Sequence, residues 1–231
     1  MEIRRLSFAQ GARTATGLAV IIDVFRACSS EPLLAYLGAE RILLEGDVDK
    51  CFAMRGDALL VGSRDEEPIA GFDLTNSPYW ILRAGTALFR GRTVIHRSTS
   101  GVGGALAALE HADEVLLASF LNARATAAYI LSCKPAVVSL VAMGSRASIR
   151  APEDEYCADY LDSLLTGKAY DHIAAMAGIL AHHNARKYLD AANPHMPKED
   201  VLLCLQRDLV DFALRAERRG AMVEAIPVRA G

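Results

Sequence analysis

The sequence has no cysteine pattern that would indicate a disulfide framework or a zinc site. Such sites need an even set of cysteines or closely spaced ligand pairs such as Cys-x-x-Cys. Here the cysteines are odd in number and far apart, at Cys28, Cys51, Cys133, Cys157 and Cys204. We therefore expect small buried hydrophobic residues in a protein of a reducing compartment.

Long apolar runs and an excess of basic charge are also missing. No stretch of about 18 apolar residues occurs, and the N-terminus lacks the apolar segment of a signal peptide. The formal net charge of −3 and the pI near 6.1 give no electrostatic footprint for nucleic acid or an anionic membrane. We expect a cytoplasmic protein with neither partner, and the pattern is compatible with a homodimer.

Linkers and repeats are absent as well. No Pro/Gly/Ser-rich or like-charge segment of useful length divides the 231 residues. At this size a chain buries roughly three-quarters of its extended surface, so its core needs no structural metal. We expect a single domain over residues 1–231.

What the sequence does contain is an alternation of short Val-, Ile- and Leu-rich runs with segments of helical period. This pattern is typical of buried parallel strands joined by helices. It predicts a three-layer α/β/α fold with a mainly parallel or mixed sheet. Strands are expected at 18–25, 41–45, 58–61, 93–96, 114–119, 136–142 and 222–228. Helices are expected at 31–37, after the N-cap Asp47, and over most of 152–220.

Polar turns follow several of these strands, at 23–29, 98–101, 119–122 and 144–154. In an open α/β sheet, ligands bind outside the carboxyl ends of the strands. The sequence therefore predicts that these turns meet at one crevice.

Asp23 ends an otherwise apolar strand, where a carboxylate is costly unless it is paired, bound to metal or open to a pocket. Arg26 can place a guanidinium in the same turn, with the bidentate geometry that suits phosphate. A structural turn or cap role for Asp23 is the alternative. A haloacid-dehalogenase phosphatase is disfavoured, because that superfamily needs a second Asp where Phe25 stands.

Three consecutive acids, Glu153, Asp154 and Glu155, open a predicted helix. The favourable interaction of an acidic side chain with the N-terminal end of the helix dipole is enough to explain Glu155 at this position. Asp154 shares its helix face with Cys157 and Leu161 and so points into the core beside the expected crevice. We interpret Asp154 as a candidate Mg²⁺ ligand, since Mg²⁺ prefers carboxylates and water. Asp208 also lies on a predicted core-facing side of a helix, but for Asp208 we expect a structural hydrogen bond and not a metal ligand.

The segment Ser98–Gly104 follows a strand and opens a helix, so its hydroxyl and amide groups can cradle an anion. The alternative is a tight turn whose glycines serve packing. The segment lacks the lysine of a P-loop, and Leu106 breaks the Gly-x-Gly-x-x-Gly pattern. Asn122 has the same two interpretations, ligand or helix cap. The histidines have no ligand spacing, and no Gly-x-Ser-x-Gly elbow indicates a serine hydrolase.

Four segments carry a resemblance to a known family: Val20–Ala27, Gly71–Pro78, Ser119–Ala123 and Pro152–Ala158. The Gly71–Pro78 loop combines an acid, an amide and a hydroxyl, whereas a plain helix start explains only Ser77 and Pro78. In this order the segments resemble the 2-phosphosulfolactate phosphatase family, and the resemblance extends from Asp23 to the helix expected at 199–208. It implies a Mg²⁺-dependent hydrolysis of the phosphate ester of 2-phospho-3-sulfolactate, in coenzyme M biosynthesis or related sulfolactate metabolism.

The sequence departs from the family pattern in three places. Ser63 stands where the family usually has Glu, and Thr75 where it usually has Gly. The segment Ser98–Val102 replaces Thr-Thr-Asn-Gly-Thr. One acid, one amide and one hydroxyl are therefore missing.

Together, the residues and the resemblance give a hypothesis for the site. Asp23 attacks the phosphoester as a nucleophile or activates water, with Arg26 and Asp73 as the other catalytic residues. Mg²⁺ is held by Asp154 and Glu153. The substrate, a small anionic phosphoester, is bound by Arg64, Asn76, Ser77, Ser98, Thr99, Ser100 and Asn122. The alternatives are a hydrolase for another phosphorylated or sulfonated acid, and a binding protein that has lost turnover.

Overall fold

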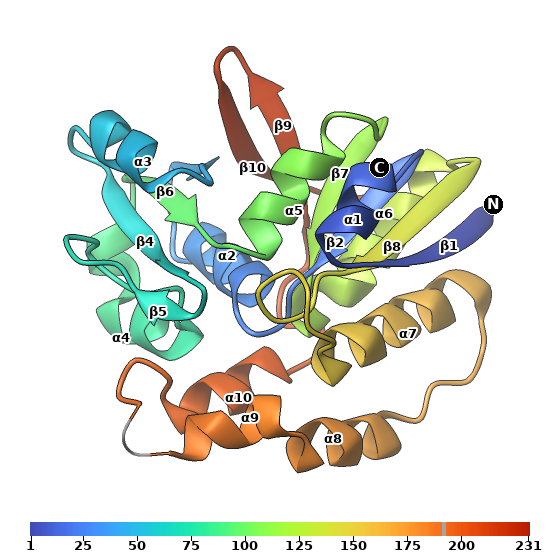
Figure 1. Cartoon of the computed structure of the whole chain (residues 1–231). Helices are drawn as coiled ribbons and strands as arrows, with labels where there is room; N and C mark the ends of the chain where they lie inside the picture. The colour runs from blue at the N-terminus through green and yellow to red at the C-terminus, as the bar shows by residue number, and fades with distance from the viewer. Residues whose placement is uncertain (191–192) are drawn as a thin grey trace.

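In the computed structural model, which describes residues 1–190 and 193–231, ten strands form one sheet in the order β1-β8-β2-β7-β9-β10-β3-β6-β4-β5 (Figure 1). The strands are β1 (Glu2–Ser7), β2 (Leu18–Ile22), β3 (Arg41–Leu44), β4 (Leu59–Arg64), β5 (Glu67–Pro68), β6 (Thr93–Arg97), β7 (Glu114–Ala118), β8 (Val137–Ala142), β9 (Ala213–Arg219) and β10 (Met222–Val228). Strands β1, β8, β2 and β7 are mutually parallel, as are β3, β6 and β4. The antiparallel hairpin β9–β10 joins the two groups.

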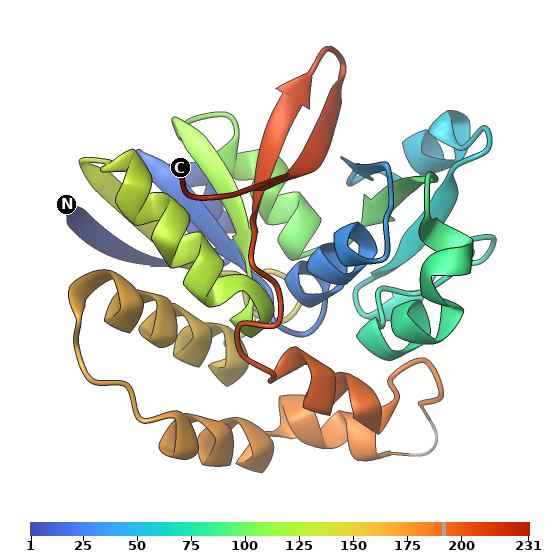
Figure 2. The same ribbon diagram turned by 180° about the vertical axis from the view of Figure 1, so that it is seen from behind.

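Helices cover both faces of this sheet. They are α1 (Phe8–Thr14), α2 (Ala27–Tyr36), α3 (Val48–Met54), α4 (Pro78–Phe89), α5 (Gly101–Ala108), α6 (Ala123–Cys133), α7 (Pro152–Thr166), α8 (His172–Ala181), α9 (His183–Arg186) and α10 (Lys198–Cys204), with short 3₁₀ turns η1 (Phe120–Asn122) and η2 (Lys187–Leu189). Helices α1 and α5 lie in front of the sheet in Figure 1, and α6 lies on its other face, toward the viewer in Figure 2. The predicted three-layer α/β/α fold with a mixed sheet is confirmed.

Strand β2 shows why the sequence folds in this way. All five of its residues are buried, so a continuous apolar run serves both faces. Ile21 packs into the core beneath α2 and α5, whereas Val20 and Ile22 pack into the core beneath α6 and α7. The strand ends at Ile22 and not at Phe25 as predicted, which places Asp23 directly after the carboxyl end.

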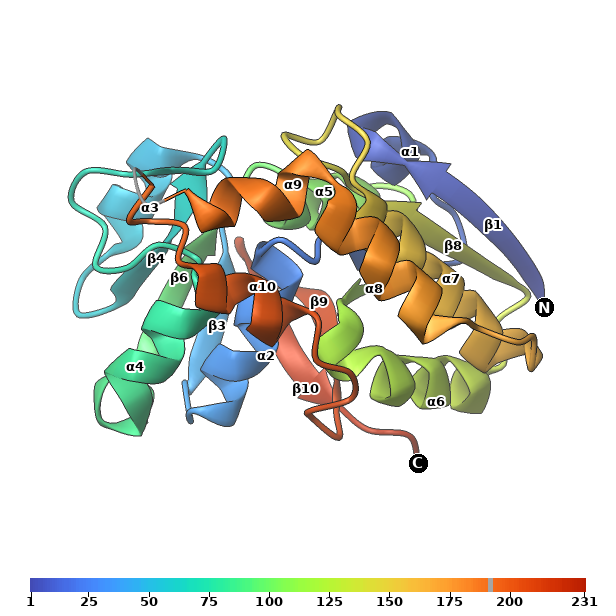
Figure 3. The same cartoon turned by 90° about the horizontal axis from the view of Figure 1, so that it is seen from below.

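The prediction of helix for most of 152–220 is wrong at its end. Residues 213–219 form β9, although Ala, Leu, Arg and Glu are strong helix formers. Pairing with β7 and β10 on both sides overrides this local preference. Strand β1 was not predicted either; it is an edge strand with only part of its surface buried. Figure 3 shows α8, α9 and α10 crossing the lower side of the molecule.

The predicted cap of α3 is confirmed: Asp47 accepts a hydrogen bond from the Lys50 N–H at 2.9 Å. The prediction of buried cysteines is correct for Cys28, Cys51, Cys157 and Cys204 and wrong for Cys133, which is exposed. No helix within the described ranges has the length and apolar character that crossing a membrane requires.

Candidate active site

Four strand ends and one loop enclose a small cavity of about 30 Å³. Asp23 follows β2, Ser98 follows β6, Ser145 lies in the turn after β8, and Ser63 lies near the end of β4. The complete lining is Asp23, Phe25, Arg26, Ser63, Asp65, Glu66, Asn76, Ser98, Thr99, Ser100, Ser145 and Arg146. The structure thus brings together Asp23, Arg26, Asn76, Ser98, Thr99 and Ser100, six residues predicted from the sequence.

Asp23 is held so that one carboxylate oxygen stays free. Its Oδ2 accepts a hydrogen bond from the Gly101 N–H at 2.7 Å, and Oδ1 accepts none within the described part of the chain. A side chain at Gly101 would be excluded, because its Cβ would lie 2.8 Å from the Ala27 Cβ and 3.0 Å from Asp23 Oδ2. Burial raises the pKa of Asp23 to about 7, against the lowering effect of the Gly101 N–H. The free oxygen belongs to a carboxyl group that is only 4% exposed.

Two arginines give the cavity its positive charge. Arg26 is 3% exposed, and its Nη1 donates to Asp200 Oδ2 at 2.8 Å and to the His195 carbonyl at 2.7 Å. Its Nε and Nη2 have no hydrogen-bond partner among the described residues, so they remain free for a ligand. Arg146 enters from the turn after β8. Guanidinium groups bind phosphate oxygens in a fork-like geometry, so this cavity suits a phosphoryl group.

The hydroxyl groups of the Ser98–Ser100 turn tie the loops of the site together. Ser98 Oγ accepts from the Val102 N–H, and Thr99 Oγ1 accepts from the Asp65 N–H. Ser100 Oγ donates to the Gly144 carbonyl at 2.9 Å and accepts from the Ala147 N–H at 2.9 Å. The turn therefore fixes the cavity wall while its residues also line it.

Glu66 was not singled out from the sequence, yet it closes one side of the cavity. It lies in the turn between β4 and β5, and its Oε1 accepts from Ser145 Oγ at 2.8 Å and from Lys187 Nζ at 2.7 Å. Burial opposes ionisation, but Lys187 and Ser145 hold the pKa of Glu66 below its usual value. The only signal for Glu66 in the sequence was its nearness to Ser63. Position 63 is the one at which the family usually has a glutamate, and Glu66 follows it by three residues.

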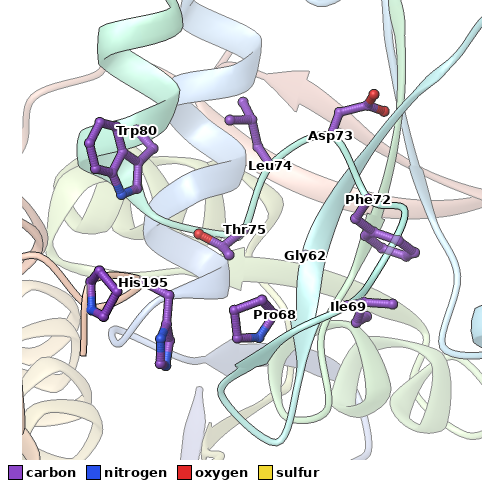
Figure 4. Close-up of a pocket in the computed structure, with 10 residues that line it drawn as sticks. Gly62, Pro68, Ile69, Phe72, Asp73, Leu74, Thr75, Trp80 and His195 are labelled. Carbon is purple, nitrogen blue, oxygen red and sulfur yellow. The ribbon is translucent and has the colours of Figure 1, made fainter. Parts of the chain in front are cut away.

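Asp73 lies outside this cavity. Its Oδ2 accepts from the Leu60 N–H and its Oδ1 from Arg55 Nη2, both at 2.8 Å. It borders a different pocket, shown in Figure 4, in which its carboxylate points away from Thr75 and His195. The structure therefore does not bring Asp73 into the crevice of Asp23.

Ser77, Asn122 and Arg64 also lie outside the cavity. Ser77 caps α4 by accepting from the Trp80 N–H, and its Oγ donates to Asp200 Oδ1. Asn122 accepts from the Ser119 N–H and donates to the Leu117 carbonyl, which is the helix-cap alternative. Arg64 is exposed at the end of β4.

Asp154 points into the core as the helix-face argument predicts, but it lies behind the cavity and does not line it. Its Oδ1 accepts from the Val24 N–H at 2.7 Å and its Oδ2 from the Gly144 N–H at 2.8 Å. The carboxylate thereby joins the turns that follow β2 and β8. No group of three or more His, Cys, Asp or Glu side chains in the described ranges is arranged to hold a metal ion.

Asp154→Asn is expected to lower the free energy of unfolding by about 1–3 kcal/mol, because asparagine has one acceptor oxygen for two buried N–H donors. Urea denaturation measures this change. Glu155→Gln is the control, since Glu155 makes only partly exposed ion pairs with Arg5 and Arg150. Unchanged stability with loss of Mg²⁺-dependent turnover would instead support the metal role inferred from the sequence.

Glu153 is 3% exposed and accepts one hydrogen bond, from Asn184 Nδ2 at 3.2 Å. Burial raises its pKa from 4.5 to about 7, and the nearby Asp23 adds to this shift. The folded protein therefore binds a proton at pH 5–7 that the unfolded chain releases. This contribution to stability is complete below pH 4.5 and is lost as the pH rises through about 7.

Glu153→Gln should remove that dependence. Between pH 5 and pH 8 the wild-type protein should lose on the order of 2 kcal/mol more unfolding free energy than the variant. Denaturant unfolding at pH 5, 6.5 and 8 measures the difference. If the unfolding free energies of the wild type and of Glu153→Gln change equally with pH, the raised pKa of Glu153 is refuted.

The sequence was compared with known proteins. A family model described as 2-phosphosulpholactate phosphatase matches residues 7–218. A Bacillus subtilis protein named probable 2-phosphosulfolactate phosphatase is 30% identical, with 87% of each chain covered. Proteins of the same name from Caldicellulosiruptor saccharolyticus and Clostridium perfringens are 31% and 32% identical, with 90% and 84% of this chain and 91% and 84% of theirs covered. The chain belongs to the 2-phosphosulpholactate phosphatase family.

Proposed function

We propose that this protein hydrolyses the phosphate ester of 2-phospho-3-sulfolactate to sulfolactate and phosphate. One observation carries the proposal: the free carboxylate oxygen of Asp23 shares a small strand-end cavity with Arg26 and Arg146. The names of the relatives point to the same reaction. The resemblance to the family further leads us to place the reaction in sulfolactate metabolism, including coenzyme M biosynthesis, in the cytoplasm.

In this proposal the arginines bind the phosphoryl group. Arg26 contributes Nε and Nη2, while Asp200 and the His195 carbonyl fix its Nη1. Arg146 binds from the opposite turn. Stabilising charge on transferring phosphoryl oxygens is the main task of such a site.

Asp23 Oδ1 is the proposed proton acceptor for the attacking water. It is the oxygen left free when Oδ2 binds the Gly101 N–H. Acid quenching during turnover separates this role from direct attack by the carboxylate. Direct attack would transiently leave the phosphoryl group on Asp23, where mass spectrometry of the peptide would find it.

We propose Mg²⁺ as the cofactor, held by Glu66 beside Asp23. The residues fit such an ion, because both carboxylates line the cavity and the contacts of Glu66 with Ser145 and Lys187 use only its Oε1. Mg²⁺ commonly uses one or two protein carboxylates, completing its shell with water and substrate phosphate. When bound, the ion would neutralise negative charge on the phosphoryl oxygens.

A second candidate is a binding protein that has kept the anion cavity without turnover. Ser63 favours it, since it lines the cavity with a hydroxyl where the family pattern has a carboxylate. Release of phosphate from synthetic 2-phosphosulfolactate, with Mg²⁺ and with EDTA, tests both candidates. Saturable binding of the substrate without phosphate release would overturn the phosphatase proposal and support the binding protein.

A further inference from the structure

Arg26 is a buried cation with one free edge. Its Nη1 donates to Asp200 Oδ2 at 2.8 Å and to the His195 carbonyl at 2.7 Å. Nε and Nη2 have no hydrogen-bond partner among the described residues, and neither nitrogen is fully buried. These two nitrogens form the edge of a guanidinium that binds an anion through two parallel hydrogen bonds. The hydrogen bonds of Nη1 leave the flat faces of the group uncovered.

The ring of Tyr188, in η2, lies against this guanidinium. Arg26 Cζ is 5.7 Å from the ring centroid, within the distance of about 6 Å at which the face of an aromatic ring attracts a cation. The same ring packs on Phe25, with 5.4 Å between the centroids. Arg26 and Phe25 line the catalytic cavity, whereas Tyr188 does not. Tyr188 therefore supports the cavity wall from outside.

Neighbouring residues of the chain hold this ring in place. Lys187 Nζ lies 5.8 Å from the centroid of the Tyr188 ring and 2.7 Å from Glu66 Oε1. Asn184, in α9, donates to the buried Glu153 at 3.2 Å. Helix α9 leads into η2 on the lower side of the molecule (Figure 3). Residues 184–188 are thus docked at the site by an ion pair, a hydrogen bond and the ring contacts.

An aromatic ring suits this place because of what it leaves undone. Burial takes water away from the guanidinium, so the group needs electrostatic stabilisation within the protein. A second carboxylate would give it, but would also bind the free N–H groups and neutralise the charge that attracts a phosphoryl group. The face of Tyr188 attracts the cation and accepts neither Nε nor Nη2.

We propose that Tyr188 is a positioning residue for Arg26, whose ring holds the guanidinium while the edge formed by Nε and Nη2 stays free for the phosphoryl group. The inference rests on the proposed phosphatase function and adds the residue on which phosphoryl affinity depends. The effect of Tyr188 on the substrate passes through Arg26, since Tyr188 lies outside the cavity lining.

Calorimetric titration with inorganic phosphate tests the proposal without turnover. Tyr188→Leu should raise the Kd for phosphate about tenfold, because leucine fills much of the space and has no aromatic face. Tyr188→Phe keeps the ring and should bind phosphate as the wild type does. Pentafluorophenylalanine at the same position keeps the shape of phenylalanine but reverses the charge on the ring face, so it should weaken binding as leucine does.

Tyr160→Leu is the matched control. Tyr160 is another buried tyrosine, 4% exposed, with the Arg207 guanidinium 5.2 Å from its ring centroid. Neither Tyr160 nor Arg207 lines the cavity. Tyr160→Leu should lose stability, whereas its Kd for phosphate should stay that of the wild type. Equal weakening of phosphate binding in both leucine variants would reduce Tyr188 to a packing residue and overturn the proposal.

Kinetics with 2-phosphosulfolactate separate this role from the proposed function. Tyr188→Leu should raise KM about tenfold and change kcat by less than about threefold. Ring-dependent phosphate binding without any hydrolysis would overturn the phosphatase function and keep the role of Tyr188. Hydrolysis with the same KM and the same Kd for phosphate in wild type and Tyr188→Leu would overturn that role alone.

Two further outcomes are decisive. If Tyr188→Leu does not fold, the comparison of phenylalanine with pentafluorophenylalanine decides, because the two rings fill nearly the same space; equal phosphate affinities would overturn the role of Tyr188. Absence of phosphate binding by the wild type would overturn the anion cavity and, with it, both proposals.

Discussion

Replacing Asp200 by alanine is expected to lower the free energy of unfolding by about 3–5 kcal/mol, because it leaves the Arg26 guanidinium buried without a counter-ion. The two side chains are 2% and 0% exposed, and their ion pair is 2.8 Å long. The other oxygen of Asp200 accepts from Ser77 Oγ at 2.7 Å and from the Tyr79 N–H at 2.9 Å. One carboxylate thus fixes an arginine of the active site and the start of α4.

Urea denaturation of Asp200→Ala and of Glu199→Ala measures this effect. Glu199 is the control, because it occupies the same first turn of α10 but is only partly buried. Its loss should change stability by less than about 1 kcal/mol. If both variants unfold at the same urea concentration as the wild type, the buried ion pair contributes nothing to the fold.

Local patterns could not have predicted the role of Asp200. Its partners Arg26 and Ser77 are 174 and 123 residues away in sequence, and nothing near Asp200 indicates them. A carboxylate in the first turn of a helix has the ordinary explanation of the helix dipole. Only the packing of α10 beside α2 and α4 shows that this one is an arginine ligand.

The sequence did predict half of the residues that line the cavity, and part of the reason is topological. Parallel neighbours end at one edge, so the turns after β2 and β8 lie together, as do the ends of β4 and β6. The two groups are joined by an antiparallel hairpin, so this rule does not predict that they meet; the hydrogen bond from the Gly101 N–H to Asp23 shows that they do. Asp73 lies away from the cavity, because its loop returns along β4 and its carboxylate binds the Leu60 N–H at the beginning of that strand.

Asp154 shows what a helix-face argument can and cannot predict. The face assigns it correctly to the interior, where it is 2% exposed. Its partners, however, are the backbone N–H groups of Val24 and Gly144, and every residue except proline has such a donor. The sequence pattern therefore cannot distinguish this structural carboxylate from a metal ligand.

Asp23→Asn is expected to lower kcat for 2-phosphosulfolactate by about 10³-fold, within the range of 10²–10⁴ that a general base contributes. The amide oxygen of asparagine can still accept from the Gly101 N–H, so the position of the side chain should be retained. The new NH₂ group faces the cavity and cannot accept a proton. Phosphate release under saturating substrate, together with denaturation of the same preparation, measures both properties.

The expected pattern is a stable protein that binds substrate and does not turn it over. The stability of Asp23→Asn should equal or exceed that of the wild type above pH 7. The substitution removes a buried carboxyl group whose pKa is raised by burial to about 7.

Asp113→Asn makes the same chemical change at an exposed position before β7 and should leave kcat unchanged. Turnover by Asp23→Asn within tenfold of the wild type would remove Asp23 from the reaction. The arginines would then remain as an anion site whose catalytic group lies elsewhere, and Glu66, a half-buried carboxylate on the cavity wall, would be the residue to test next.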